Sequence, residues 1–163
     1  MALTSDEKLL ALGRENGQIE IYRLTLFAST NKSSTPSSIF RSSTWTMIHT
    51  IPGIKSSGIR NIIWYEPDFI TFSKPTNNPF LYNSSSGDVC PRRLITTGLN
   101  GAVIEWDFIT NQPRKIIDLG DVAIWDCAKH NDQLYLACDD GAIRIISLES
   151  FSELKRLPSV NVR

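Results

Sequence analysis

Reactive side chains are scarce in this chain. Its 163 residues include two histidines, His49 and His130, and three cysteines, Cys90, Cys127 and Cys138. The cysteines are odd in number and lack Cys-x-x-Cys spacing, so we expect reduced thiols and neither a disulfide framework nor a zinc site. No Gly-x-Ser-x-Gly elbow, Walker motif or Gly-x-Gly-x-x-Gly loop occurs, and a catalytic triad would need one of the two histidines. We therefore expect no enzyme, no catalytic, cofactor-binding or metal-binding residues, and no small-molecule ligand.

The chain also lacks an excess of charge and any long apolar run. Seventeen basic side chains balance seventeen acidic ones, which removes long-range attraction toward nucleic acid or an anionic membrane. No apolar run approaches the ~20 residues that cross a bilayer. The first ten residues include acidic side chains and have no signal-peptide core. We expect a protein of the cytosol or nucleus with no membrane partner.

A segment with a glycine turn at its centre occurs three times. The copies are Leu10–Tyr22, Leu94–Trp106 and Leu134–Ile146, and their glycines are 84 and 40 residues apart. A spacing near 40 with two strands and a tight turn in each unit is typical of a β-propeller blade. The pattern therefore predicts an all-β protein.

The turns predict how these strands pair. Asn16-Gly17, Asn100-Gly101 and Asp140-Gly141 are strong signals for two-residue type I′ hairpins, because Asn, Asp and Gly all tolerate the positive φ that this turn requires. Alternating and β-branched residues predict further strands between the hairpins, and no amphipathic helix is evident. The expected strands are Leu9–Leu12, Gln18–Arg23, Trp45–Ile51, Ile59–Tyr65, Leu94–Thr97, Ala102–Asp107, Arg114–Ile117, Val122–Ala128, Leu134–Cys138, Ala142–Leu148 and Glu153–Leu157.

Two stretches interrupt the pattern, at about 29–43 and 66–91. The first is rich in Ser and Thr, and the second in Pro and Ser, so both are interpreted as long loops inserted into blades. Within the second, Ile70-Thr71-Phe72 and Phe80-Leu81-Tyr82 either pack over a blade edge or anchor a partner.

The strands amount to about three four-stranded blades in a single partial propeller domain, residues 1–163. A closed propeller needs four to eight blades, so this chain alone is not expected to close the ring. The first blade is expected to begin at its hairpin, with no earlier strand, and Glu153–Leu157 to open a further blade. Either the chain is truncated or a second chain completes the ring.

The second hairpin carries a family resemblance. Leu99–Asp107 reads LNGAVIEWD and ends in a Trp-Asp pair, with Gly58-Ile59 and Trp64 ahead of it. Together with Leu10–Tyr22 and the later Ala137–Gly141, which follows Ile124-Trp125, it resembles the cirhin-type WD-repeat proteins over about two-thirds of the chain. There are departures: no Gly-His pair occurs, and Arg23 and Ser147 stand where the Asp of the pair would be.

This resemblance implies a non-enzymatic scaffold of the nucleolar small-subunit processome. Its process would be maturation of the small-subunit ribosomal RNA precursor, coupled to transcription, and its partners the early-assembling processome proteins, with indirect or weak contact to the precursor RNA. The alternatives are a WD-repeat adaptor in a ubiquitin ligase or in trafficking, or an enzyme whose carboxylates converge at a propeller channel.

Several polar residues are candidates for chemistry but favour structural roles. Asp107, Asp126, Asp139 and Asp140 are explained by turns and by the Trp-Asp position, although acid–base or metal chemistry is the alternative. Glu105 is expected to lie on the face of Val103. Its expected partner is a basic residue of a neighbouring blade, Arg144 or Arg60, and a binding role is the alternative.

Aromatic and basic residues are assigned in the same way. Trp64, Trp106 and Trp125 are expected between blades, and Trp45 is the best candidate for an exposed aromatic, with packing still favoured. The pairs Arg92-Arg93, Arg114-Lys115 and Lys155-Arg156 are expected on solvated faces, with RNA phosphates as the alternative partner.

Overall fold

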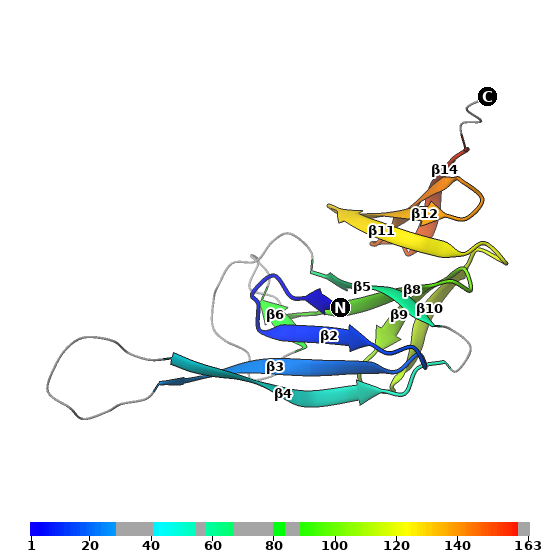
Figure 1. Cartoon of the computed structure of the whole chain (residues 1–163). Coiled ribbons are helices and arrows are strands. Elements are labelled where there is room, and N and C mark those ends of the chain that lie inside the picture. Colours follow the sequence, from blue (N-terminus) through cyan, green and yellow to red (C-terminus); the bar gives the residue numbers. More distant parts are fainter. Residues whose placement is uncertain (29–40, 55–57, 67–79, 84–88, 160–163) are drawn as a thin grey trace, which may run out of the picture.

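The computed structural model describes residues 1–28, 41–54, 58–66, 80–83 and 89–159. Within these ranges it contains strands and no helix. Twelve of the strands form three four-stranded antiparallel sheets, which we call blades 1 to 3 (Figure 1). The blades form an arc that does not close into a ring, with blade 2 between the other two.

Blade 1 contains β1 (Ala2–Leu3), β2 (Leu9–Gly13), β3 (Ile19–Ala28) and β4 (Arg41–Ile51) in that order. The prediction that no strand precedes the first hairpin was wrong, because β1 pairs with β2. Only two residues form β1, too few for an alternating pattern, and backbone pairing holds it in place. Beyond Arg23, where the pairing with β2 ends, β3 and β4 continue as a two-stranded ribbon (Figure 1).

Blade 2 contains β5 (Ile59–Tyr65), β8 (Arg93–Gly98), β9 (Ala102–Asp107) and β10 (Gln112–Asp118), in the order β10-β9-β8-β5. The described part of the stretch 66–91 is not only loop, because β6 (Leu81–Asn83) and β7 (Val89–Pro91) form a small hairpin. Phe80 packs against the core, as the local-packing interpretation predicted. Ile70-Thr71-Phe72 lies outside the described residues.

Blade 3 contains β11 (Ile124–His130), β12 (Gln133–Cys138), β13 (Ile143–Ser147) and β14 (Ser152–Leu157). The prediction that Glu153–Leu157 opens a further blade was wrong, because β14 pairs with β13 as the outer strand of this blade. The sequence shows a strand there but does not show which neighbour it pairs with.

The three hairpins share one turn, which differs from the predicted type I′. Gly17, Gly101 and Gly141 have φ of 84°, 76° and 73°, whereas the Asn or Asp before each does not have a positive φ. Each glycine N–H donates to the carbonyl three residues earlier, at 3.0–3.2 Å. This is a three-residue loop in which a type I turn ends in a left-handed glycine. The Asn or Asp side chain accepts the N–H two residues later, at 3.0–3.3 Å, which accounts for its recurrence.

Two apolar cores lie between the blades and follow the strand alternation. Ile104 and Trp106 of β9 point to the core shared with blade 1, and Val103 points to the core shared with blade 3. In all three blades, the residues two and four positions after the hairpin glycine define what we call the forward face. Those at three and five positions define the backward face. Each fully buried Leu or Ile in these cores contributes about 1.5–3 kcal/mol to stability.

Candidate interaction surfaces

Two consecutive arginines join blade 2 to both of its neighbours. Arg93 is the first residue of β8 and Arg92 directly precedes it, and successive side chains along an extended chain point to opposite sides. Arg92 reaches carboxylates at the junction with blade 1, and Arg93 reaches a carboxylate and a carbonyl at the junction with blade 3. The prediction that this pair is solvated was wrong, since Arg92 is 7% exposed and the Arg93 side chain 15%.

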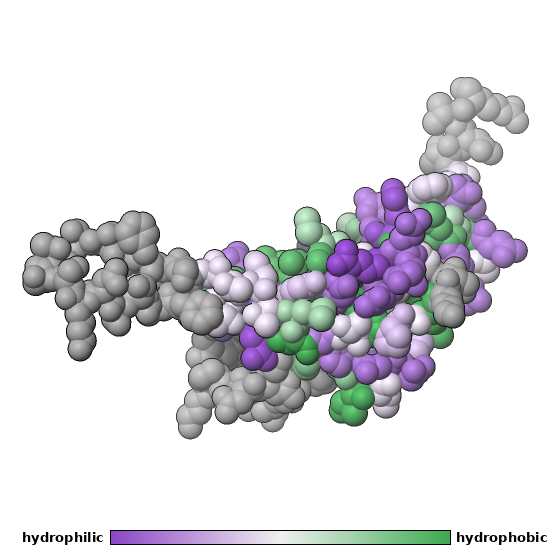
Figure 2. Space-filling view, turned by 60° about the horizontal axis from the view of Figure 1, so that its bottom comes forward, coloured by the Kyte–Doolittle hydropathy of each residue, from purple (hydrophilic) through white to green (hydrophobic). Residues whose placement is uncertain are grey.

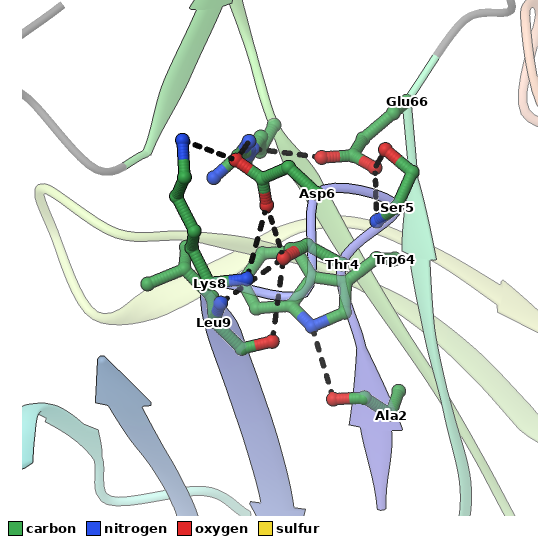
Figure 3. A network of polar contacts seen from close by, with 9 residues as sticks. Ala2, Thr4, Ser5, Asp6, Lys8, Leu9, Trp64 and Glu66 are labelled. Carbon is green, nitrogen blue, oxygen red and sulfur yellow. Dashed lines mark hydrogen bonds and ion pairs between the residues drawn. The ribbon is translucent and has the colours of Figure 1, made fainter. Parts of the chain in front are cut away.

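The junction with blade 1 is a polar network that includes Ser5, Asp6 and Glu66 (Figure 3), and Arg92 binds both carboxylates. The guanidinium binds Asp6 Oδ2 at 2.8 Å and Glu66 Oε1 at 2.7 Å. Ser5, in the β1–β2 loop, donates its amide and its hydroxyl to Glu66 Oε2 at 3.0 and 2.6 Å. The network therefore ties the β1–β2 loop to the ends of two strands of blade 2.

Asp6 has a lowered pKa within this network. Burial opposes its ionisation, but hydrogen bonds from Thr4 and Arg92 together outweigh burial and hold the pKa of Asp6 below its ordinary value. Thr4 Oγ1 donates to Asp6 Oδ1 at 2.7 Å, and the more distant Lys8 Nζ lies 3.7 Å from Oδ2. Asp6 is therefore an ionised, engaged carboxylate and not a general acid.

The junction with blade 3 is built on Glu105. This carboxylate is 1% exposed and receives two hydrogen bonds from Arg93, at 2.9 and 2.7 Å. Arg93 also donates to the carbonyl of Leu148 in blade 3 at 2.6 Å, and Arg114 lies 3.4 Å from Glu105. Glu105 is on the face of Val103, as predicted, but its arginine partners come from its own blade.

Neither Arg144 nor Arg60, the partners predicted for Glu105, makes that contact. Arg144 pairs with Asp140 at 3.1 Å and lies 3.8 Å from Glu153. The Arg60 guanidinium instead lies over the Trp125 ring. Arg93 takes their place because it is two residues before Ile95, whose cross-strand partner is Glu105. That diagonal lies within one sheet, and only the register reveals it.

Tyr65 extends the blade 2–blade 3 junction. The Arg93 guanidinium lies 4.9 Å from the centre of the Tyr65 ring, a cation–π distance. The phenol donates to Asp132 of blade 3 at 2.6 Å. Burial, followed by this hydrogen bond, raises the pKa of Tyr65 well above its ordinary value, so the phenol stays protonated as a donor.

The aspartates that the sequence offered for chemistry are mostly occupied by turns. Asp107 Oδ1 accepts the amides of Ile109 and Thr110 at 2.7 and 3.2 Å, which lowers the pKa of Asp107. The hydrogen bond from the Ala142 amide likewise lowers the pKa of Asp140, which also pairs with Arg144 and Arg156.

The two remaining candidate aspartates do not converge with these on one site. Asp126 accepts the Cys127 amide at 2.9 Å, and Asp139 accepts the Trp125 indole N–H at 2.8 Å. Among the described residues no group of three or more His, Cys, Asp or Glu side chains is placed to hold a metal ion. In the same part of the chain, no helix is long and apolar enough to span a bilayer.

The described thiols are poor nucleophiles. Burial, with a smaller contribution from Asp126, raises the pKa of Cys127 to about 11, and burial also raises that of Cys138. Both are free, as the sequence predicted. The side chain of Cys90 lies outside the described residues.

The tryptophans divide between core and surface. Trp64 and Trp106 are 6% and 3% exposed, as predicted, and the Trp106 indole donates to Thr96 Oγ1 at 2.8 Å. The prediction for Trp125 was wrong, because it is 48% exposed. The register of β11 shifts between Ile124 and Asp126, and this bulge takes Trp125 out of the alternation. Trp45 is 39% exposed, since it lies on the ribbon beyond β2.

Apolar side chains reach the surface on the backward face of blade 1. Leu3, Leu10, Tyr22 and Met47 are successive cross-strand partners and form one row across all four strands. Leu3 and Met47 are 46% and 54% exposed. In the view of Figure 2, hydrophobic surface lies exposed between hydrophilic regions. Sequence reasoning missed this surface, because only the blade arrangement shows which face stays open.

A second open surface is the forward face of blade 3, where apolar side chains lie between Asp126 on β11 and Lys155 on β14. Ile143 pairs with Ala137 on one side and Leu157 on the other, and Ile145 pairs with Tyr135. Ile143 is 44% exposed and Leu157 36%. The two open surfaces lie on the outer sides of the first and last blades, so they mark where further protein can pack.

Comparison with known proteins shows the fold. No protein-family model matches the sequence, and no curated protein matches it. A solved structure, the WD40 domain of Toxoplasma gondii coronin, is similar with a TM-score of 0.55 and 12% identity. The similarity covers 93% of this chain and 30% of that one, so this chain spans less than a third of its neighbour. The predicted partial WD40-type β-propeller of three four-stranded blades is thereby confirmed, at the level of the fold.

Proposed function

We propose that the protein is a non-enzymatic interaction scaffold of the nucleolar small-subunit processome, acting in maturation of the small-subunit ribosomal RNA precursor. The observation that carries the scaffold role is the row of Leu3, Leu10, Tyr22 and Met47, in which Leu3 and Met47 are exposed. The carboxylates of Glu66 and Glu105, at the blade junctions, are held in ion pairs. Exposed apolar surfaces of this kind bind other proteins.

The processome assignment is supported by the resemblance of Leu99–Asp107 to the cirhin-type repeat. In the structure this segment is the central hairpin of blade 2, and its Trp106 is buried against blade 1. The coronin domain shares the fold alone and so does not distinguish this assignment from an adaptor in a ubiquitin ligase or in trafficking.

The placement of the arginines favours protein partners over RNA. Arg92 and Arg93 are engaged in buried ion pairs and are not available to phosphates. Arg156 is accessible but pairs with Asp140 at 2.6 Å. Combined with a net charge of zero, this predicts contact with the precursor RNA mainly through other proteins.

Affinity purification of the tagged chain from nuclear extract tests the proposal. The expected result is recovery of early-assembling processome proteins together with precursor RNA. A high-salt wash that removes these proteins should remove the RNA with them. The variant Met47→Asp should reduce recovery, and Ile109→Asp, on the β9–β10 turn of blade 2 and 93% exposed, serves as the matched control. Recovery of coat or ubiquitin-ligase proteins in place of nucleolar ones would reject the assignment. Fluorescence microscopy should show the tagged chain in nucleoli.

A further inference from the structure

We propose that two copies of this chain associate head to tail and close a six-bladed ring. In this assembly the forward face of blade 3 of each copy packs on the backward face of blade 1 of the other. The inference concerns self-association and does not depend on the processome assignment. It gives the row of Leu3, Leu10, Tyr22 and Met47 to a second copy, so a dimer would place the processome contacts elsewhere on the ring.

Both internal junctions use the same positions after the hairpin glycine. Ile19 and Ile21, two and four residues after Gly17, are fully buried at the junction of blades 1 and 2. Val103 and Glu105 hold the same positions after Gly101 and are buried toward blade 3. The forward face of a blade therefore packs against the backward face of the next.

Blade 3 has isoleucines at the same forward-face positions as blade 1, but no blade packs on them. Ile143 and Ile145 are two and four residues after Gly141, the positions that Ile19 and Ile21 occupy in blade 1. Ile143 is nevertheless 44% exposed, whereas Ile19 is 0% exposed. The same residue type at the same position thus lies in a core in one blade and in the open in the other.

The backward face of blade 1 offers a surface on which the open face of blade 3 can pack. Its backward-face residues on β3 are Glu20 and Tyr22, three and five positions after Gly17. Glu20 pairs with Arg14 at 2.6 Å and with the Tyr22 hydroxyl at 2.9 Å, so its charge is already compensated. The rest of the row, Leu3, Leu10 and Met47, is apolar. It can pack on Ile143, Ile145 and Leu157 of the open face of blade 3, with Asp126 and Lys155 at the edges of that face.

The number of blades and the symmetry of the contacts favour a second copy of the chain as the partner, in a closed ring. Propellers contain four to eight blades, and two arcs of three give six. Both new junctions would be identical, since each pairs blade 3 of one copy with blade 1 of the other, as two-fold symmetry requires. Closure also covers both open faces at once, whereas a single head-to-tail contact leaves one of each exposed.

Light scattering after size-exclusion chromatography of the purified 163-residue chain tests the proposal. The expected mass is twice that of one chain. Ile143→Asp blocks the forward face and Met47→Asp the backward face, and each should give the mass of one chain with an unchanged circular-dichroism spectrum. Ile109→Asp, outside both faces, should keep the double mass.

Mixing the two blocked variants tests the head-to-tail arrangement. The Ile143→Asp copy retains a free backward face and the Met47→Asp copy a free forward face, so an equimolar mixture should recover mixed dimers. The proposal is overturned if the unmodified chain has the mass of one copy, which would leave these faces to further blades or other proteins. It is equally overturned by a mass above two copies, by dissociation in only one of the two variants, or by a mixture that stays monomeric.

Discussion

Arg92 and Arg93 are adjacent in sequence and bind carboxylates on opposite sides of the same blade. Arg92 lies 2.8 Å from Asp6 of blade 1, and Arg93 lies 2.7 Å from Glu105 while donating to Leu148 of blade 3. Strand alternation places the two guanidiniums at different junctions. These two consecutive arginines therefore connect blade 2 to both blade 1 and blade 3.

Removing Arg93 should destabilise the fold strongly. Arg93→Met leaves Glu105 as a buried carboxylate without its two closest hydrogen bonds, and loss of one partner of such a pair costs about 3–5 kcal/mol. Urea unfolding followed by circular dichroism measures the change. The double variant Arg93→Met, Glu105→Leu should recover most of the loss, because neither charge remains. A double variant as unstable as the single one would show that the ion pair is not the reason.

Acid should loosen the blade 1–blade 2 junction through Asp6. Its pKa is lowered in the folded state, so its contribution to stability is complete above the unfolded pKa of ~4 and is lost as the pH falls through the folded value. The urea midpoint should therefore fall as the pH is lowered below about 4, and further as it passes through the lowered pKa of Asp6. Asp6→Asn should lower stability at pH 7 and flatten this part of the profile. An unchanged slope in the variant would contradict the role given to Asp6.

Gly101, in the hairpin turn of blade 2, should be more sensitive to alanine than Gly120, another left-handed glycine. Gly101 and Gly120 have nearly the same φ, 76° and 75°. A Cβ on Gly101 would lie 2.3 Å from the Gly120 carbonyl oxygen, whereas one on Gly120 would have no neighbour within 4 Å. Gly101→Ala should thus cost at least about 1 kcal/mol more than Gly120→Ala. Equal losses in thermal unfolding would mean that the close approach at the hairpin is absent.

Substitution of Trp106 should destabilise the fold more than substitution of Trp125. Trp106→Phe removes the hydrogen bond to Thr96 and leaves that buried hydroxyl unpaired, a loss of about 1–3 kcal/mol. Trp125→Phe changes a half-exposed side chain and should cost under about 1 kcal/mol. Iodide should quench less of the remaining fluorescence in Trp125→Phe than in Trp106→Phe. The reverse order of quenching would place Trp125 in the core.

The strand pattern was predictable because alternation and glycine turns are local properties. The hairpins at Gly17, Gly101 and Gly141 follow from residues within a few positions of each other, although the turn type depends on φ of the preceding Asn or Asp. By contrast, β1 is too short to leave a pattern, and the exposure of Trp125 follows from a bulge that alternation does not encode.

The candidate site was less predictable because it depends on which blades meet. Glu105 was placed on the correct face, but its partner Arg93 is set by the register of β8 against β9. The open row of Leu3 and Met47 likewise consists of ordinary strand residues until the blade arrangement leaves one face uncovered. Periodicity tells which residues share a face, and only packing tells what covers it.

The central claim is that the three glycine hairpins belong to separate sheets packed face to face. Methyl and amide nuclear Overhauser contacts in the isotope-labelled chain test it most directly. The account predicts methyl contacts within the core that joins Ile21 to Leu94 and within the core that joins Val103 to Leu136, and no amide ladder between β4 and β5 or between β10 and β11. Cross-strand amide contacts linking those strands into one continuous sheet would contradict it.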